Sequence, residues 1–332
     1  MTYRAVLQQS LALLVLAIGP AFVEADERTP EDATGLGWRR TDTALTLLRG
    51  DEVVWQFNFG SDQGKPFLHP VNLPRVGTLT WEAPPDHPWH HGIWFSWKLI
   101  NGRNYWEENR KTGQSDGRTT WRNVKIRQGE DHSARIEMDL NYHPPDKPPV
   151  LTERRVVEIS PPDSDGGYRI DWTATFTAGD QQVVLDRTPL PHEPGGKSYG
   201  GYAGLSVRLA KNAAHFKVVE SEQQVNQQAE RLRFKARAVD FGGSIDDTDG
   251  GIAILDHPKN LNAPSPWYVI RNTRTPMTYF SPAVIQRGPH TLAAGEAFTL
   301  RYRILVHPGR FSAATLQQHY NRFAESTADK QE

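Results

Sequence analysis

Apolar and polar residues alternate with a period of two along most of the chain, which is the pattern of β-strands that bury one face. Short stretches rich in Gly, Pro, Asp and Glu separate neighbouring runs and predict tight turns between antiparallel strands. The runs lie at residues 44–48, 53–59, 121–128, 134–142, 150–159, 167–177 and 298–306. The pattern therefore predicts a series of β-hairpins.

Helical periodicity is almost absent before residues 312–323. There Leu316, Tyr320 and Phe323 follow one another at helical spacing, and Ser312 can cap the first turn. Many strands, few helices and no regular alternation of strand and helix predict an all-β fold. We expect a large antiparallel β-sandwich with one C-terminal helix.

No break in composition and no internal repeat divides this pattern. We therefore expect a single β-sandwich domain over residues 38–326. Residues 26–37 are polar and are expected to form a disordered linker, and residues 327–332 a disordered tail.

The N-terminus predicts export from the cytoplasm. Arg4 supplies a positive start, residues 11–18 are apolar, and residues 23–25 form a small-x-small cleavage site. We therefore expect residues 1–25 to be a signal peptide and the mature protein to be extracytoplasmic, either periplasmic or secreted. A retained N-terminal membrane anchor is the alternative, although the apolar run is short for a membrane span. No later segment is apolar for the roughly 18 residues that a span needs, so we expect no membrane contact after cleavage.

Composition and charge exclude several classes of protein. The 332 residues include 38 Lys and Arg against 39 Asp and Glu, a net charge of −1. This balance argues against a nucleic-acid partner, which would need a basic patch. The chain has no Cys, which excludes disulfides, thiolate metal ligands and cysteine nucleophiles. We infer no obligate protein partner and no required cofactor.

The densest group of chemically active side chains lies at residues 86–108. This stretch holds three of the twelve His and four of the ten Trp, together with Lys98 and two adjacent Glu. Imidazoles and carboxylates transfer protons near neutral pH, and indole faces stack on apolar surfaces such as the CH face of a sugar. Prolines fix the backbone at residues 84–88, and fixed loops on rigid scaffolds often carry sites. We interpret the stretch as a carbohydrate cleft, and packing with loop chemistry only is the alternative.

A second polar cluster, residues 186–193, precedes a glycine-rich loop at residues 195–205. The loop lacks the spacing of a phosphate-binding P-loop and no helix follows it, so a nucleotide site is disfavoured. We expect this loop to let the backbone approach a ligand, and a plain turn is the alternative.

Residues 86–95 (DHPWHHGIWF) resemble the hallmark of the methane oxygenase PmoA-like family of uncharacterised domains. That hallmark is roughly Asp-His-Pro-His-His-Arg-Gly-Leu-Trp-Phe, followed by Asn-Gly-x-x-Phe/Tyr-Trp. Further matches lie at residues 65–71, 151–155, 201–208, 265–269 and 292–303, so the resemblance covers nearly the whole mature chain. Trp89 stands where His is usual and His91 where Arg is usual, as in a subgroup of the family. If the Arg binds an anion, His91 weakens that role here.

The family name implies methane oxidation, which this chain argues against. A membrane copper oxygenase subunit needs several apolar spans of about 20 residues, and none follows the signal peptide. The closing segment at residues 294–303 (AGEAFTLRYR) is also similar to galactose-mutarotase-like β-supersandwiches. That similarity implies a fold that hosts aldose epimerases, polysaccharide lyases and glycosidases, and the fold alone does not choose among them.

We therefore expect a protein that acts on sugars or oligosaccharides by His/Glu acid–base chemistry, as an epimerase, a lyase or a hydrolase. The catalytic candidates are His87, His90, Glu107 and Glu153. The substrate-binding candidates are Trp89, His91, Lys98, Trp106, Arg75, His192, Glu193 and Tyr202. Among them, Trp89 and Trp106 would form a platform for the sugar, and His91, Lys98 or Arg75 would hold an anionic oxygen. Glu193 is a further candidate for the partner carboxylate.

Two other functions stay open on the sequence. A divalent metal site would take its ligands from Asp86, His87, His90 and His91, although no tight metal-binding motif is present. A non-catalytic carbohydrate-binding protein would depend on Trp89 rather than on the histidines. For Glu153, the structural alternative is a buried ion pair with Arg155 on the same strand.

Overall fold

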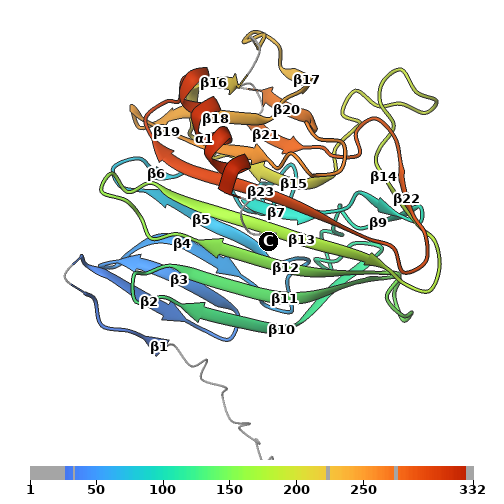
Figure 1. The fold of residues 1–332 in the computed structure, drawn as a ribbon, viewed down its shortest axis with the longest axis horizontal. Helices are drawn as coiled ribbons and strands as arrows, with labels where there is room; N and C mark the ends of the chain where they lie inside the picture. Colours follow the sequence, from blue (N-terminus) through green and yellow to red (C-terminus); the bar gives the residue numbers. More distant parts are fainter. Residues whose placement is uncertain (1–26, 33, 222–224, 273–275, 327–332) are drawn as a thin grey trace, which may run out of the picture.

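The computed structural model describes residues 27–326 except 33, 222–224 and 273–275. In this part of the chain, two large antiparallel sheets pack on each other and a small third sheet completes the fold (Figure 1). The predicted all-β class and β-sandwich architecture are confirmed. The expected signal peptide and C-terminal tail lie outside the described residues. Within them, no helix is long and apolar enough to cross a membrane.

The first sheet has eleven strands, and all hydrogen-bonded neighbours run antiparallel. Their order across the sheet is β1 (Glu27–Arg28), β2 (Leu36–Arg40), β3 (Ala44–Arg49), β4 (Glu52–Asn58), β5 (Phe67–Leu73), β7 (Ile93–Ser96), β15 (Gly204–Arg208), β21 (Met277–Pro282), β20 (Pro266–Asn272) and β17 (Arg231–Lys235), with β6 (Gly77–Thr78) paired to β5. Strands from the first and second halves of the sequence therefore meet where β7 pairs with β15.

The second sheet has eight strands and the third has four. The order in the second is β10 (Arg118–Gln128), β11 (Ala134–His143), β12 (Leu151–Ile159), β13 (Tyr168–Ala178), β23 (Ala297–Pro308), β19 (Thr248–Asp256), β18 (Ala238–Ile245) and β16 (Ala214–Glu220). The order in the third is β22 (His290–Leu292), β14 (Val183–Asp186), β8 (Leu99–Ile100) and β9 (Arg103–Asn104). The hairpins β3–β4, β10–β11 and β12–β13 follow the predicted runs and turns.

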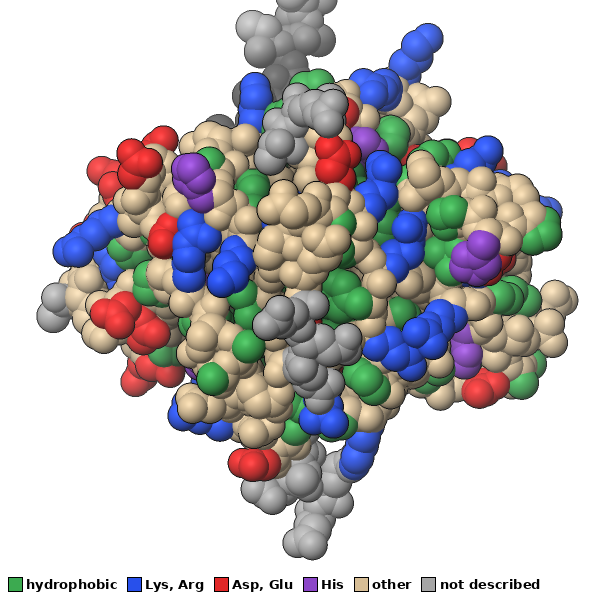
Figure 2. All heavy atoms as spheres, turned by 90° about the horizontal axis from the view of Figure 1, so that it is seen from above, with side chains coloured by type: hydrophobic (Ala, Val, Ile, Leu, Met, Phe, Trp, Pro, Cys, Tyr) green, Lys and Arg blue, Asp and Glu red, His purple; other side chains and the backbone are tan. Residues whose placement is uncertain are grey.

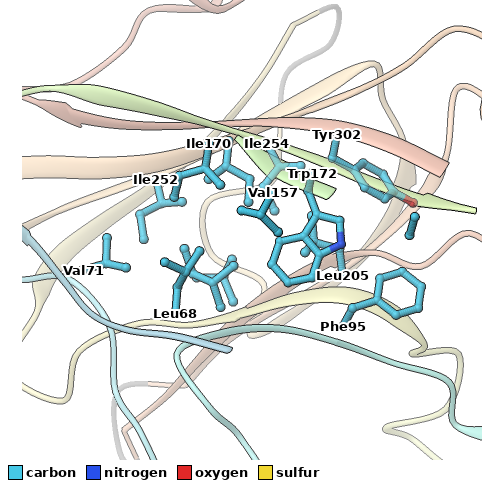
Figure 3. Packing of buried hydrophobic residues seen from close by; sticks show 14 of the residues in the cluster. Leu68, Val71, Phe95, Val157, Ile170, Trp172, Leu205, Ile252, Ile254 and Tyr302 are labelled. Carbon is cyan, nitrogen blue, oxygen red and sulfur yellow. The ribbon is translucent and has the colours of Figure 1, made fainter. Parts of the chain in front are cut away.

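The main core lies between the two large sheets, because alternate residues of each strand point inward. Along β13, Ile170, Trp172, Ala174 and Phe176 are fully buried, whereas the residues that alternate with them are more exposed. Figure 3 shows Leu68, Val71, Phe95 and Leu205 of the first sheet facing Val157, Ile170, Trp172, Ile252, Ile254 and Tyr302 of the second. Burial of this apolar surface is the main term that holds the sandwich together.

The single helix, α1 (Ala313–Ser326), closes the described chain. Its apolar face packs on Ala238, Ala253 and Leu255, on the outer side of the second sheet. The buried helix residues are Leu316, Tyr320 and Phe323, as their spacing predicted. The side-chain oxygen of Ser312 accepts a hydrogen bond from the amide of Thr315 at 3.1 Å, which is the predicted N-cap.

The predicted disordered linker at residues 26–37 differs from the structure. Strand β1 pairs with the end of β2, and the amide of Thr29 donates to the carbonyl of Trp38 at 3.0 Å. Leu36 and Trp38 are buried in the main core. The polar residues of this segment therefore add an edge strand, because their backbone groups find partners in β2 even though their side chains stay exposed.

Basic, acidic and histidine side chains are interspersed on the face drawn in Figure 2, with no continuous patch of one sign. This mixed surface agrees with the net charge of −1.

Candidate functional site

The outer face of the eleven-stranded sheet carries polar and aromatic side chains at the positions that alternate with the core. On β7, Ile93 and Phe95 point into the main core, and Trp94 lies in a second cluster on the opposite face. On β15, Leu205 and Val207 are core residues, so the side chains that alternate with them share the outer face with Trp94. Every residue of β7 and β15 is buried. The outer face is therefore covered by loops that bring further side chains against it.

The loop that precedes β7 places three histidines over this face. Its backbone is held by hydrogen bonds from His87 N to Pro84 O at 2.9 Å and from His90 N to His87 O at 3.0 Å. Gly92 enters β7 with φ 67°, and a Cβ there would collide with the carbonyl of Leu68. Only glycine fits this close approach of two strands without strain.

His90 lies inside a stack of rings at the centre of the cluster. Its ring centroid is 4.7 Å from that of His87, 4.9 Å from Trp94 and 5.4 Å from Tyr279. The side chain is 3% exposed. Burial, together with the charges of His87 and Arg208, holds the pKa of His90 well below its usual value. At neutral pH this imidazole is uncharged.

Asp86 and His87 form a half-exposed pair at the surface of the cluster. His87 Nδ1 lies 2.8 Å from Asp86 Oδ2, and the two side chains are 36% and 40% exposed. Asp86 also accepts hydrogen bonds from Arg208 Nη2, 3.2 Å from each of its oxygens. Partial burial raises the pKa of Asp86, but the hydrogen bond from His87 and the charge of Arg208 outweigh it and lower that pKa overall. Since a carboxylate only accepts, Nδ1 of His87 carries the proton.

A second group of titratable residues surrounds His91, and all but Glu82 are buried. His91 Nε2 lies 3.1 Å from Glu108 Oε2, and its Nδ1 lies 3.2 Å from Glu82 Oε1. Lys65, which is 2% exposed, forms an ion pair with Glu108. Burial would raise the pKa of Glu108, but the charge of Lys65 and the hydrogen bond from His91 lower it to about 2. Burial lowers the pKa of His91, yet hydrogen bonds to Glu108 and Glu82 leave it raised overall.

A third group borders the first two and is partly exposed. Lys98 forms an ion pair with Glu107, and the hydroxyl of Tyr202 donates to Glu107 Oε1 at 2.8 Å. The Lys98 ammonium lies 5.7 Å from the centroid of the Tyr202 ring, and that ring packs on Trp106 at 5.0 Å. The Glu107 side chain is 28% exposed. Burial and the neighbouring charge of Glu107 raise the pKa of Tyr202.

Comparison with known proteins identifies the family. Residues 44–321 match the model of a family described as "Family of unknown function (DUF6807)". This chain belongs to DUF6807. None of the curated proteins matches it. The resemblance to the methane oxygenase PmoA-like family stays a prediction, because none of these comparisons shows it.

Several solved structures resemble this DUF6807 chain at low identity. The galactosidase domain of an α-galactosidase–sucrose kinase has 12% identity and a TM-score of 0.38, and the match covers 86% of this chain and 42% of that one. A proposed aldose 1-epimerase from Klebsiella pneumoniae has 12% identity and a TM-score of 0.38, with 87% and 83% covered. The α-galactosidase from Lactobacillus brevis has 9% identity and a TM-score of 0.42, with 87% and 40% covered. These likenesses are too distant to support an argument about function.

Most of the site residues predicted from the sequence come together in the DUF6807 structure. Ring contacts and hydrogen bonds link His87, His90, Trp106, Tyr202, Glu107 and Lys98, and His91 is joined to them through Trp94. Trp89 lies at the rim, half-buried, with its ring centroid 5.5 Å from that of His87. Trp106 is 1% exposed, so the structure does not leave it open as a sugar platform. It is instead buried with Trp94 in the second aromatic cluster.

Glu153 does not join this cluster, which corrects its prediction as a catalytic residue. It lies on β12, is 2% exposed, and pairs with Arg155 Nε at 2.6 Å. Tyr142 also donates a hydrogen bond to it. Arg155 in turn lies 4.9 Å from the centroid of the Trp172 ring in the main core. The buried ion pair that was the structural alternative is what the structure contains, because both residues alternate into the core on one strand.

Three further predicted residues lie on other segments of the chain than the loop that carries the histidines. Arg75 is exposed in the turn between β5 and β6, at the opposite end of β5 from Phe67, which stacks on His91. His192 is exposed in its loop. Glu193 accepts from the amide of Leu190 at 2.6 Å and pairs with Arg187, so it stabilises that loop.

The proposed metal ligands point to different partners. Asp86 faces Arg208, and His91 faces two carboxylates rather than the other histidines. Among the residues that the structure describes, no three His, Asp or Glu side chains converge as a metal ion would require.

Two grooves of about 910 and 790 Å³ lie on the outer side of the eight-stranded sheet. Outward residues of β13 and β23, such as Arg169 and Arg303, line both. Neither groove is lined by His87, His90, His91 or the residues described above that contact them. The candidate site is therefore a half-exposed rim over a packed interior and is separate from these two grooves.

Sequence reasoning missed several residues of the cluster. They are Lys65, Glu82, Glu108, Arg208 and Tyr279. Arg208 carried one usable signal, since a charge within the otherwise apolar run of a buried strand must have a partner. Glu108 stands beside Glu107 in the stretch noted above, but no local pattern showed that it pairs with Lys65 and His91. Lys65, Glu82 and Tyr279 gave no signal, because their neighbours in sequence do not indicate what faces them in the fold.

Proposed function

We propose that this protein binds a sugar or oligosaccharide at the rim formed by Asp86, His87 and Trp89, and that His87 transfers a proton on the bound ligand. The observation that carries the proposal is the half-exposed Asp86–His87 pair, whose carboxylate is held from below by a fully buried arginine. Burying the charge of an arginine costs free energy. Here the buried arginine holds the Asp86 carboxylate at the surface, and that carboxylate orients the imidazole of His87. The described residues give His87 Nε2 no hydrogen-bond partner, so that nitrogen can face a ligand.

The choice of a sugar rests on the aromatic partner of His87. Trp89 is half-buried at the rim, and an indole edge or face beside polar groups suits a ring with one apolar side and many hydroxyls. The similarity to galactose-mutarotase-like folds that we noted in the sequence points in the same direction. Epimerase, lyase and hydrolase reactions all include a proton transfer by a positioned base or acid.

Glu107 is the second acid–base group in this proposal. Its carboxylate is partly exposed, and contacts with Lys98 and Tyr202 fix its orientation without burying it completely. His90 does not share this role with His87, because it is buried and uncharged. The residues that transfer protons in the proposal are therefore His87 and Glu107, and His90 and His91 support them.

A panel of free sugars, oligosaccharides and uronates tests the proposal, with polarimetry, ultraviolet absorbance of unsaturated products and reducing-end assays as readouts. We expect His87→Gln to lower kcat by roughly 10²–10⁴-fold with KM little changed. Trp89→Ala should raise KM with a smaller effect on kcat. His215→Asn, an exposed histidine on β16, is the matched control and should behave as wild type.

The burial of His90, His91 and Trp106 favours one other candidate, a carbohydrate-binding protein without catalysis. Titration calorimetry with the same panel separates the two. Binding that Trp89→Ala abolishes and His87→Gln leaves intact, with no turnover of any sugar, would reject the enzyme and support the binding protein.

The proposal places the protein outside the cytoplasm, because residues 1–25 have the pattern of a signal peptide. We expect the full-length chain expressed in a bacterium to be found in the periplasm or medium. Sequencing of the mature N-terminus should give a start near Asp26. A chain that stays in the membrane with Met1 intact would instead support the retained anchor.

A further inference from the structure

We propose that Arg208 is a positioning residue for His87, acting through Asp86 to hold the imidazole in one tautomer with its Nε2 free to accept a proton. This inference rests on the proposed function of His87 and names the residue that prepares it. Arg208 itself is not exposed to ligand, since its side chain is 0% exposed.

The contacts of Arg208 fix its guanidinium from several sides. Nη2 donates to the carbonyl of Pro276 at 2.7 Å as well as to both oxygens of Asp86. The guanidinium carbon lies 5.1 Å from the centroid of the Trp81 ring. The backbone is fixed too, because Arg208 N donates to Gly92 O at 2.8 Å. The charge therefore has one position, set by the centre of the sheet.

Asp86 is the acidic partner that the described residues give this buried cation. Asp86 is itself 40% exposed, and a surface carboxylate without such a partner would rotate freely in water. An arginine that holds both oxygens leaves the carboxylate one orientation, with Oδ2 2.8 Å from His87 Nδ1. The contacts therefore connect Arg208 in the sheet to Asp86 in the loop, and Asp86 to the half-exposed imidazole of His87.

The same guanidinium also decides which of the two stacked histidines can carry charge. Its Nη1 lies 3.4 Å from Nδ1 of His90, so a proton on His90 would face a cation as well as the ring of His87. His87 has the carboxylate of Asp86 beside it, whereas the described part of the chain places no carboxylate in a hydrogen bond with His90. A proton taken from a ligand therefore stays on the outer imidazole, from which it can return to the ligand.

Nitrogen-detected NMR of the histidine side chains tests the inference without a substrate. In the wild type, neutral His87 should be the Nδ1–H tautomer, and Asp86→Asn should shift the population toward Nε2–H. Arg208→Met should produce the same shift, and Arg208→Lys, which keeps the charge but cannot hold both oxygens and Pro276 together, a smaller one. Circular dichroism establishes that each variant is folded.

With an active sugar identified, we expect Arg208→Met to lower kcat about 10–100-fold and Arg208→Lys less, with KM nearly unchanged. A folded Arg208→Met with the wild-type tautomer and kcat would overturn the inference. If Arg208→Met does not fold, unchanged tautomer and kcat in Arg208→Lys would overturn it. If no sugar is turned over although the tautomer depends on Arg208, the proposed function fails and the link from Arg208 to His87 stands.

Discussion

At the scale of single residues, the cluster depends on ionised groups that are almost fully buried. Lys65 and Glu108 are 2% and 8% exposed, and His91 lies between Glu108 and Glu82. Two charges leave water at a cost of several kcal/mol each, which good mutual geometry offsets. These residues therefore stabilise the buried layer beneath the proposed site. Removing one charge would leave its partner buried without an opposite charge.

Glu108→Gln tests this dependence. The substitution keeps the shape but leaves Lys65 without its buried anion, so we expect the free energy of unfolding to fall by about 3–5 kcal/mol. Urea denaturation monitored by tryptophan fluorescence measures it. Glu82→Gln is the control, because Glu82 is 33% exposed and should cost less than about 1 kcal/mol. Equal losses for the two variants would contradict the buried network.

Glu108 and His91 also predict that the free energy of unfolding depends on pH. The pKa of Glu108 is lowered to about 2 from an ordinary value of 4.5, so its stabilising contribution is present above pH 4.5 and is lost as the pH falls toward 2. The difference between wild type and Glu108→Gln should shrink over this range. The pKa of His91 is raised, so its contribution is present at low pH and is lost as the pH rises through that raised value.

At the scale of elements, the site depends on how the loop that carries the histidines leads into β7. Gly92 is the last residue before this strand. Its amide donates a hydrogen bond to Trp81 O at 3.1 Å, and its carbonyl accepts one from Arg208 N. Its positive φ lets the backbone pass close to Leu68, and the rings of His90 and His91 just before it pack on Trp94 and Phe67 of the outer face. A side chain at this position would displace the loop rather than a single rotamer.

Gly92→Ala should therefore destabilise the protein more than the same change at Gly295. Both glycines have φ near 70°, but a Cβ at Gly295 meets nothing within 4 Å. Thermal unfolding should give a loss of about 1 kcal/mol for Gly295→Ala, from the positive φ alone, and a loss larger by about 2 kcal/mol or more for Gly92→Ala. Matching losses would mean that the close approach to Leu68 is not important.

At the scale of the whole molecule, the candidate site and the helix lie on opposite outer sides of the sandwich. The cluster lies on the outer face of the eleven-stranded sheet. Helix α1 packs on β16, β18 and β19 of the eight-stranded sheet (Figure 1). The main core separates them. Stability contributed by the helix should therefore be independent of ligand binding.

Leu316→Ala tests this separation. Removing a fully buried leucine should lower the free energy of unfolding by about 2–5 kcal/mol, because a cavity forms between α1 and the sheet. Sugar affinity measured by calorimetry well below the melting temperature should stay as in the wild type. Gln318→Ala, exposed on the same helix, is the control. A large loss of affinity in Leu316→Ala would show that the two sides are coupled.

Local pattern was sufficient for the strands, the hairpins and the helix, because their periods of two and about 3.6 residues appear directly in the sequence. It was also sufficient to bring Asp86, His87, Trp89, His90 and His91 together, since they are neighbours on one loop. It failed for Glu153 because a catalytic acid and the acid of a buried ion pair have the same local pattern. It failed for residues 27–37, where partners across the sheet order a polar segment.

The sequence by itself thus determined the all-β class, the closing helix and the stretch in which the histidines lie, all of which depend on residues close together along the chain. The tertiary structure alone decided which histidine is exposed, which carboxylate orients it and which arginine lies beneath them. Asp86 and Arg208 are 122 residues apart and meet only because β15 pairs with β7. Contacts of that kind follow from strand order and burial, which no local period encodes.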